Sequence, residues 1–377
     1  MKRLFCIFLC FLLLCSCSKK TVKKNYDERR LKGIWISCYE LSFGDKSKQA
    51  FTKNIDKMLC EIKQNGFNTI FVHVRSHSDA YYNSKIFPIS SFIAGKQGKK
   101  IDYDPLEIIT YFAKVYSLKI HAWINPFRII LGNNTKSIST KNPAYSLIKN
   151  NDRRVRFAED GYYYNPAYKW VRNLILRGIE EVLQNYDIDG IHFDDYFYPT
   201  TEKSFDDKEY KASKTSHSLE NWRRENIDKL IKSVYKLTHK YNKIFGVSVH
   251  CSFYYNYNLQ YANVKKWCKN KGYTDYIAPQ IYYGFSEKEK TPDNQPLAFK
   301  ECLEYWKEKV KNVPIYIGLA LYRCEEKGEF KNDNKIIAKQ AIISCKKANG
   351  FIVFSYSYMK RNKKQMKNFT KKIKPTD

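Results

Sequence analysis

Short apolar runs alternate with longer amphipathic segments along most of this chain. Short runs rich in β-branched and aromatic residues are typical of buried strands, whereas apolar residues at every third or fourth position are typical of helices. The predicted strands cover residues 31–37, 68–75, 119–124, 190–193, 245–250, 276–281, 315–318 and 351–354. The predicted helices cover residues 48–65, 168–186, 219–241, 259–270, 297–311 and 333–347, and one more begins at 104–105.

These eight strands in alternation with helices predict an α/β fold, a (β/α)8 TIM barrel. Strands that alternate with helices pair in parallel, and strands that are buried on both faces are apolar throughout, as these are. A doubly wound open sheet is the alternative, but it usually has a Gly-rich turn after its first strand, and residues 37–42 contain no glycine. Two long loops, residues 76–103 and 126–165, would lie on the C-terminal face of the barrel, where catalytic sites form.

The first 30 residues predict export and membrane attachment. Lys2 and Arg3 precede an apolar run over residues 4–14, which is too short to span a bilayer. The run ends in Leu-Cys-Ser-Cys, which resembles a bacterial lipobox with Cys17 as the lipidated residue. A plain secretory signal cut nearby is the alternative. An acyl anchor such as palmitate would hold a lipoprotein at a membrane of the cell envelope, on its periplasmic or outer surface.

The chain therefore divides into four predicted parts. They are a lipoprotein signal peptide over residues 1–16, the lipidated cysteine with a basic tether over 17–30, the barrel over 31–360 and a basic C-terminal tail over 361–377. The tether is too polar to order itself by burying apolar surface.

The chain is strongly basic, with 67 Lys and Arg against 38 Asp and Glu and a formal net charge of +29. Such a charge invites a nucleic-acid interpretation. We reject it because the lysines are spread along the chain and accompany no nucleic-acid motif. The charge suits anionic cell-wall polymers or a membrane surface equally well. The cysteines form no Cys-x-x-Cys pair, so zinc is not indicated, and we expect no cofactor.

The most informative stretch is residues 189–199, Asp-Gly-Ile-His-Phe-Asp-Asp-Tyr-Phe-Tyr-Pro. It begins as the fourth strand and then presents two adjacent carboxylates, Asp194 and Asp195, beside aromatic residues. In (β/α)8 barrels the catalytic groups lie at the C-terminal ends of the strands. A carboxyl group beside a like charge or an apolar wall can keep its proton near neutral pH, as a general acid must. The alternative is a pair that caps the next helix or binds a structural ion.

Polar and aromatic residues also gather at the ends of other predicted strands. The candidate substrate-binding residues are Arg75, Asp79, His121, Trp123, Asn125, Arg128, His192, Tyr196, His250, Gln280 and Tyr282. Clusters at the same end of several strands are hard to explain as core packing, because a buried polar group without a partner costs about 1–3 kcal/mol. Aromatic rings stack on sugar faces, and Asn, Gln, Arg and His bind hydroxyl and N-acetyl groups.

Several single residues keep two interpretations. His192 and His121 are as compatible with hydrogen-bonded core histidines as with active ones. Arg75 would orient Asp194 or Asp195, with a structural ion pair as its alternative. A metal centre, as in barrel deacetylases, is the competing kind of site, but no tight spacing of metal ligands supports it.

At these residues the chain resembles glycosyl-hydrolase-like family 10, a family of bacterial exported lipoproteins that was formerly a domain of unknown function. The matching runs are residues 31–36, 66–75, 79–82, 103–106, 121–128, 189–199, 221–227 and 275–282. The resemblance implies a (β/α)8 barrel and glycoside hydrolysis, with bacterial cell-wall glycan as the substrate class. This chain departs from the family pattern at Ser76, after Ser248, and at Tyr283. These changes concern the substrate subsites more than the barrel.

The first functional hypothesis is a lipid-anchored glycosidase that acts on an N-acetylated, peptidoglycan-type polysaccharide. Asp195 or Asp194 would be the general acid. A weaker likeness to chitinase-type barrels leaves open whether a second carboxylate or the substrate's own N-acetyl group supports the reaction. The alternatives are a non-catalytic glycan-binding lipoprotein and a metal-dependent polysaccharide deacetylase.

Overall fold

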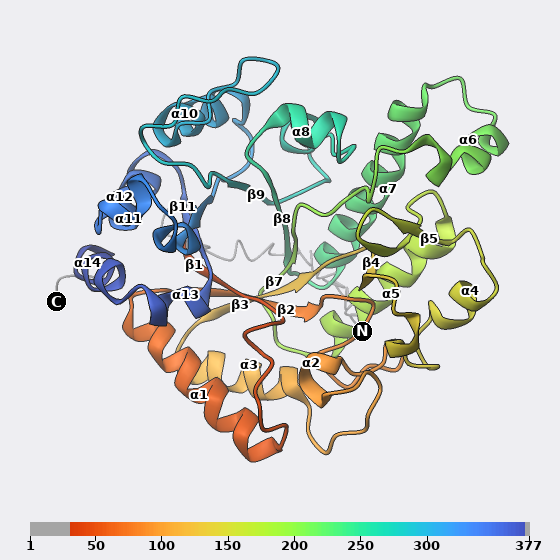
Figure 1. Ribbon diagram of the computed structural model, residues 1–377, viewed down its shortest axis with the longest axis horizontal. Helices are drawn as coiled ribbons and strands as arrows, with labels where there is room; N and C mark the ends of the chain where they lie inside the picture. Colours follow the sequence, from red (N-terminus) through yellow and green to blue (C-terminus); the bar gives the residue numbers. More distant parts are fainter. Residues whose placement is uncertain (1–30, 374–377) are drawn as a thin grey trace, which may run out of the picture.

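The computed structural model describes residues 31–373, in which eight strands close into a parallel barrel (Figure 1). The order around the barrel is β1-β11-β10-β9-β8-β7-β3-β2. The strands are β1 (Leu31–Ile36), β2 (Thr69–Arg75), β3 (Lys119–Ile124), β7 (Gly190–Phe193), β8 (Ile244–His250), β9 (Tyr276–Gln280), β10 (Ile317–Ala320) and β11 (Gly350–Phe354). The predicted signal peptide, Cys17 and the tether lie outside the described residues.

Helices connect successive barrel strands and form an outer layer around them (Figure 1). The main helices are α1 (Lys48–Gln64), α3 (Pro105–Val115), α5 (Lys169–Asn185), α7 (Leu219–Lys240), α9 (Val264–Lys269), α10 (Phe299–Lys309), α12 (Ile336–Lys347) and α14 (Lys363–Ile373). Apolar side chains between the helices and the sheet form one large core. The predicted (β/α)8 barrel is therefore confirmed.

A second, smaller core fills the inside of the barrel. It contains aromatic side chains from several strands, among them Trp35, Phe71, Trp123 and Tyr276. The Tyr276 ring needs a glycine on the neighbouring strand, since a Cβ at Gly246 would lie 1.8 Å from the Tyr276 Cζ atom. The barrel interior is thus packed beneath the C-terminal face, so any substrate must bind above these rings.

Capping residues account for the helix boundaries that the sequence predicted and for one that it did not. Asp104 caps α3 by accepting from Leu106 N–H, with Pro105 at the first helical position. The helix predicted over residues 259–270 was wrong: the segment begins only as α9, after the short helix α8 (Phe253–Asn258). Asn263 caps α9, and Tyr261 has a left-handed φ of 51°, so no helix runs through them.

Both long loops carry structure of their own on the C-terminal face. The loop after β2 contains α2 (Ser91–Ala94), and the loop after β3 contains α4 (Tyr145–Lys149). The second loop also forms a three-stranded sheet, which the sequence analysis did not predict. Its strands are β4 (Arg128–Leu131), β5 (Val155–Ala158) and β6 (Gly161–Tyr164), in the order β4-β6-β5.

The shorter helices that remain are α6 (Asp207–Ser213), α11 (Glu329–Asn332) and α13 (Tyr356–Arg361). No helix had been predicted after residue 354. There α13 is followed by α14, which packs on α12 and buries Met366 and Phe369. Among residues 31–373, no helix is both long and apolar enough to cross a membrane.

Candidate active site

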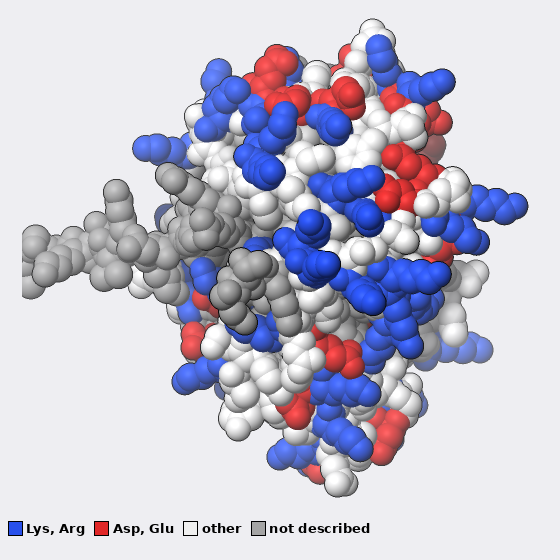
Figure 2. All heavy atoms as spheres, turned by 90° about the vertical axis from the view of Figure 1, so that its left-hand side faces the viewer, with Lys and Arg blue, Asp and Glu red and all other residues white. Residues whose placement is uncertain are grey.

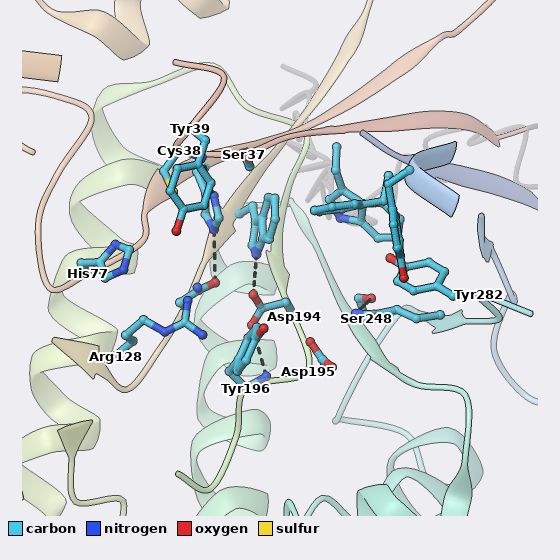
Figure 3. Close-up of a pocket in the computed structure, with 17 residues that line it drawn as sticks. Ser37, Cys38, Tyr39, His77, Arg128, Asp194, Asp195, Tyr196, Ser248 and Tyr282 are labelled. Carbon is cyan, nitrogen blue, oxygen red and sulfur yellow. Dashed lines mark hydrogen bonds between the residues drawn. The ribbon is translucent and has the colours of Figure 1, made fainter. Parts of the chain in front are cut away.

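A cavity of about 300 Å³ opens at the C-terminal end of the barrel (Figure 3). Eight of the residues predicted to form the site line it: Trp123, Asn125, Arg128, Asp194, Asp195, Tyr196, Gln280 and Tyr282. They come from the ends of β3, β7 and β9 and from the segments that follow these strands. The closed barrel brings these separated stretches of sequence together around one hollow.

Asp194 and Asp195 follow the last residue of β7 and differ in their surroundings. Asp194 is only 3% exposed. Its Oδ2 atom accepts from Trp123 Nε1–H at 3.1 Å, and its Oδ1 atom accepts from the Tyr196 N–H at 3.3 Å. Asp195 is half-buried and lies beside Asp194 in the lining of the cavity (Figure 3). One carboxyl group is therefore held in place, and its neighbour is accessible.

The pair is arranged to keep a proton near neutral pH. Burial, and then the adjacent Asp195 carboxylate, raise the pKa of Asp194 to about 7. Burial also raises the pKa of Asp195, while the Gln280 side chain opposes this rise. Two adjacent carboxylates in a cleft of low polarity cannot both ionise easily. A group of this kind can act as a general acid at neutral pH.

The positive charge that acts on the aspartate pair is Arg128, whereas the sequence analysis had given this role to Arg75. The Arg128 guanidinium group lies over the Tyr196 ring, 4.1 Å from the centroid. Burial alone would lower the pKa of Arg128, but the neighbouring Asp194 and Tyr196 raise it overall. In return, the Arg128 charge opposes the rise in the pKa of Asp194. Arg128 thus limits how strongly the pair holds its proton.

We expect kcat/KM on a glycan substrate to fall as the pH rises through the range in which the Asp194–Asp195 pair, whose pKa values are both raised, loses its proton, because the general acid is then ionised. In an Arg128→Gln variant the opposing positive charge is gone. The falling limb should then move to higher pH, by roughly one unit. A pH–rate profile of the wild type and the variant measures this shift.

Arg177→Gln, on the exposed face of α5, is the matched control. A shift of the same size in the control would contradict the role of Arg128.

A stacked layer of side chains fixes the floor of the cavity beside Asp194. The His73 ring stacks on the Trp123 ring, with centroids 3.4 Å apart. His73 Nδ1 accepts from the Cys38 N–H, so its Nε2–H donates to Asn125 Oδ1 at 3.2 Å. This bond directs the Asn125 amide, whose NH2 group has no partner among the described residues. Asn125 is therefore able to donate to a bound sugar.

His121 and His192 do not line the cavity. Both are fully buried in the barrel, where each Nδ1 atom lies within 3.0 Å of the Tyr276 hydroxyl. His192 Nε2 accepts from Trp35 Nε1–H at 3.2 Å. Burial lowers the pKa of His192 well below its usual range and that of His121 to about 3. Both rings are neutral core residues beneath the site, and the interpretation of them as sugar-binding residues does not fit these positions.

The remaining predicted residues support the loops around the cavity. Arg75 is 2% exposed, and its Nη2 donates to the carbonyl oxygens of Asn125 and Pro126 at 3.3 and 2.9 Å. It forms no ion pair with Asp194 or Asp195, contrary to the expectation. Asp79 accepts from the N–H groups of Ser76 and His77 and closes the turn after β2. Arg75 and Asp79 thus position the two loops and do not line the cavity.

His250, at the end of β8, also lies outside the lining of the cavity. Its Nδ1 atom accepts from the Ser252 N–H at 3.0 Å, and the Tyr255 ring packs edge-on against it. Burial lowers the pKa of His250, and the Asp195 carboxylate opposes this fall. In return, a protonated His250 would favour the ionised form of Asp195 from a distance.

The sequence analysis missed several lining residues. They are Trp35, Ser37, Cys38, Tyr39, His77, Tyr322 and Phe354. Most of them lie at or just after the C-terminal ends of β1, β10 and β11. The ends of the first and seventh predicted strands, which correspond to β1 and β10, had not been included among the candidates. The run Ser-Cys-Tyr at residues 37–39 carried the signal, because it places polar and aromatic side chains directly after a buried strand.

A buried ion pair anchors the segment that follows Asp195. Arg223 of α7 binds Asp206 with Nη2 to Oδ1 at 2.5 Å, and both side chains are fully buried. Arg223 also donates to the carbonyl oxygens of Thr201 and Glu202. Tyr198, which follows the Asp194–Asp195 pair, donates its hydroxyl O–H to Asp206. This cluster ties the segment after the pair to the helix behind it.

Replacing Arg223 with Met is expected to lower the free energy of unfolding by about 3–5 kcal/mol, because Asp206 would stay buried without its partner. Urea unfolding followed by circular dichroism measures the change. The double variant Arg223→Met/Asp206→Leu should recover much of the loss, since no charge is then left unpaired. Equal stability of the wild type and Arg223→Met would contradict this account.

The family of the chain follows from its sequence once the site is in view. The model of the family described as Glycosyl hydrolase-like 10 matches residues 30–336. The chain belongs to this family. The matched range includes β1 through β10 and both candidate aspartates, Asp194 and Asp195. The resemblance inferred from the motifs is thereby confirmed.

Two relatives in the glycosyl hydrolase-like 10 family cover most of this chain. It is 31% identical to glycosyl hydrolase YngK of Bacillus subtilis (strain 168) in an alignment of 329 positions that covers 78% of this chain and 61% of YngK. It is 29% identical to glycosyl hydrolase DigH of Escherichia coli (strain K12) in an alignment of 381 positions that covers 85% of this chain and 83% of DigH. The match thus spans about three fifths of the length of YngK.

Solved structures of glycoside hydrolases share the fold of this family member. The glycoside hydrolase domain of PgaB (BpsB) from Bordetella bronchiseptica superposes with a TM-score of 0.66 at 9% identity, covering 92% of this chain and all of that domain. The catalytic domain of a β-amylase from Paenibacillus polymyxa gives a TM-score of 0.57 at 11% identity, covering 92% and 98%. At such low identity these likenesses establish the barrel alone.

Proposed function

We propose that this protein is a lipid-anchored glycosidase that cleaves an N-acetylated cell-wall glycan of the peptidoglycan type. The observation that carries the proposal is the Asp194–Asp195 pair, which lies in the cavity with a raised pKa. Glycoside hydrolysis needs a carboxylic acid that keeps its proton at neutral pH until it protonates the leaving oxygen. Membership of a glycosyl hydrolase-like family supports the same reaction class.

The lining of the cavity supports a sugar as the substrate. Tyr39 and Tyr196 are exposed at its rim, and their rings can stack on the apolar faces of sugar units. Tyr282 is buried deeper, and its hydroxyl has no hydrogen-bond partner among the described residues. Together with the Asn125 amide it offers donors to a substrate carbonyl or hydroxyl. Polar groups of this kind are costly in a cleft unless a ligand or water satisfies them.

We assign Asp195 as the general acid and Asp194 as the residue that orients the substrate. Asp195 is accessible from the cavity, whereas both oxygens of Asp194 already accept hydrogen bonds from Trp123 and Tyr196. A carboxylate held in this way can still accept one more N–H, such as that of an N-acetyl group. The fixed Asp194 would thus place the sugar so that its glycosidic oxygen meets the Asp195 proton.

The N-acetyl group then completes the reaction. Every carboxylate that lines the cavity in the described part of the chain comes from the Asp194–Asp195 dipeptide, so no separate carboxylate faces the pair from another strand. In a substrate-assisted reaction the acetamide oxygen attacks the anomeric carbon while Asp195 protonates the leaving oxygen, and the C–O bond breaks. A water molecule, deprotonated by Asp195, next attacks the same carbon and regenerates the acetamide.

The test is digestion of purified peptidoglycan glycan strands, with and without stem peptides, by the barrel (residues 31–377), followed by mass spectrometry. The barrel contains the whole closed sheet and both catalytic aspartates. Shorter oligosaccharides with new reducing ends would support the proposal and identify the bond. Strands that bind and stay intact would overturn it in favour of a glycan-binding protein.

A metal-dependent deacetylase finds no support in the residues present. Between residues 31 and 373, no group of three or more His, Cys, Asp and Glu side chains is placed to hold a metal ion. The same digestion distinguishes this activity, since a deacetylase would release acetate and leave strand length unchanged.

A further inference from the structure

The outer face of α14 is a row of lysines. Lys363, Lys364, Lys367, Lys371 and Lys372 are all exposed, and the helix contains no Asp or Glu. Its opposite face is buried and contributes Met366, Phe369 and Ile373 to the core. The helix is therefore fixed to the barrel by one side and presents five positive charges on the other.

These five lysines are unbalanced by acids. None of them forms an ion pair with a carboxylate of residues 31–373, whereas Lys360 and Arg361 just before them pair with Glu61 and Glu325. Figure 2 shows the side of the molecule on which α14 lies in Figure 1, and Lys and Arg side chains gather across its middle. A lysine face without partners has the electrostatic character of a binding surface for anions.

The position of this face relative to the start of the barrel indicates which anion. Lys32 Nζ donates to the carbonyl oxygen of Ile373 at 2.6 Å, and Thr370 donates to Asn65 Oδ1 at 2.6 Å. The first residues of β1 therefore lie against the last turn of α14. If Cys17 carries the acyl anchor, the connecting residues 17–30 can reach at most about 50 Å, so this end of α14 stays near the membrane.

We propose that the lysine face of α14 binds the anionic headgroups of the membrane to which the protein is tethered. Basic residues near an anionic bilayer contribute about fivefold each to binding, within a Debye length of the surface. The last turn of α14 lies at the end of the barrel opposite the cavity, because it contacts Lys32 at the start of β1, whereas Phe354 at the end of β11 lines the cavity. A barrel docked in this way keeps its active site away from the tethered end. The placement of the lysine face near the membrane rests on the proposed lipid anchor. The binding of anionic lipids by the five lysines does not depend on that anchor.

The test is co-sedimentation of the barrel (residues 31–377) with vesicles of phosphatidylcholine, with and without phosphatidylglycerol. We expect binding only to the vesicles that contain phosphatidylglycerol, and weaker binding as salt is raised. A variant with all five α14 lysines changed to Gln should bind more than about 100-fold more weakly. The matched control changes five exposed lysines elsewhere to Gln: Lys211, Lys214, Lys229, Lys232 and Lys236 of α6, α7 and the turn between them.

The control variant has the same net charge as the α14 variant, so only the location of the charge differs. Equal loss of binding in both variants would overturn the proposal, because net charge alone would then explain it. No binding to either vesicle, or binding only to a purified anionic wall polymer, would overturn it as well. Turnover of soluble glycan fragments should be unchanged in both variants, so a failure of the proposed glycosidase activity would be seen separately.

Discussion

Replacing Asp195 with Asn is expected to lower kcat on glycan strands by at least about 10²–10⁴-fold, the usual contribution of a general acid. The amide has nearly the same shape as the carboxyl group but carries no proton to give to the leaving oxygen. Binding of the strands should change little, because the rim tyrosines and Asn125 remain. The measurement is the rate of appearance of new reducing ends, with substrate affinity determined in parallel.

The variant should fold normally, since a neutral amide is easier to bury than a carboxylate in this site. Thermal unfolding of the variant checks this. Asp187→Asn is the matched control, because Asp187 precedes the same strand at its opposite, exposed end. Undiminished turnover in Asp195→Asn would show that Asp195 is not the general acid. If Asp194→Asn also kept full turnover, neither aspartate could be the catalytic acid.

The barrel could be predicted from the sequence because its strands are short, apolar and well separated by helical periodicity. Helix ends were predictable where a single residue type determines them, as Asp104 and Pro105 do for α3. The segment before α9 was not, since the left-handed backbone at Tyr261 depends on contacts with residues distant in sequence. The small sheet of β4, β5 and β6 escaped prediction because its short strands are partly exposed and lie within a loop, unlike the equally short but fully buried β7 and β10.

For the site, strand ends were predictable and side-chain directions were not. Arg75 seemed placed to meet the aspartates, but the pairing of β2 with β3 shifts register between His73 and Arg75. Such an irregularity turns the following side chain away from its expected direction. Arg128 follows β3 and is the first residue of β4. Only the small sheet of β4, β5 and β6 therefore brings its side chain over the Tyr196 ring.

The depth of a side chain in the barrel was equally hidden. His121 and His192 do point inward, as their strand positions predicted, but they lie in lower layers of side chains, around Tyr276. The stagger of the strands decides which inward residue reaches the cavity, and this stagger is a property of the closed barrel. The pair at the end of β7 was found because two adjacent acids after a buried strand are rare enough to be informative on their own.

Glycan strands from which the N-acetyl groups have been removed should bind to the protein and be cleaved more than about 10³-fold more slowly. The acetamide oxygen is an intramolecular nucleophile, and well-oriented intramolecular groups act with effective molarities of roughly 10⁵ M or more. Without it, Asp195 could still protonate the leaving oxygen, but no group in the described part of the site would stabilise the anomeric carbon from the other side. Single-turnover rates on matched acetylated and de-N-acetylated strands measure the difference.

Chemical re-acetylation of the same strands is the control, since it should restore turnover if the loss came from the missing acetyl group. Asp194→Asn should then have a characteristic effect: a large loss on acetylated strands and little further loss on de-N-acetylated ones, because Asp194 acts through the acetamide. Equal cleavage of both kinds of strand would contradict substrate assistance. The second carboxylate would in that case be Asp194 itself, and the bonds from Trp123 and Tyr196 would hold a nucleophile in place.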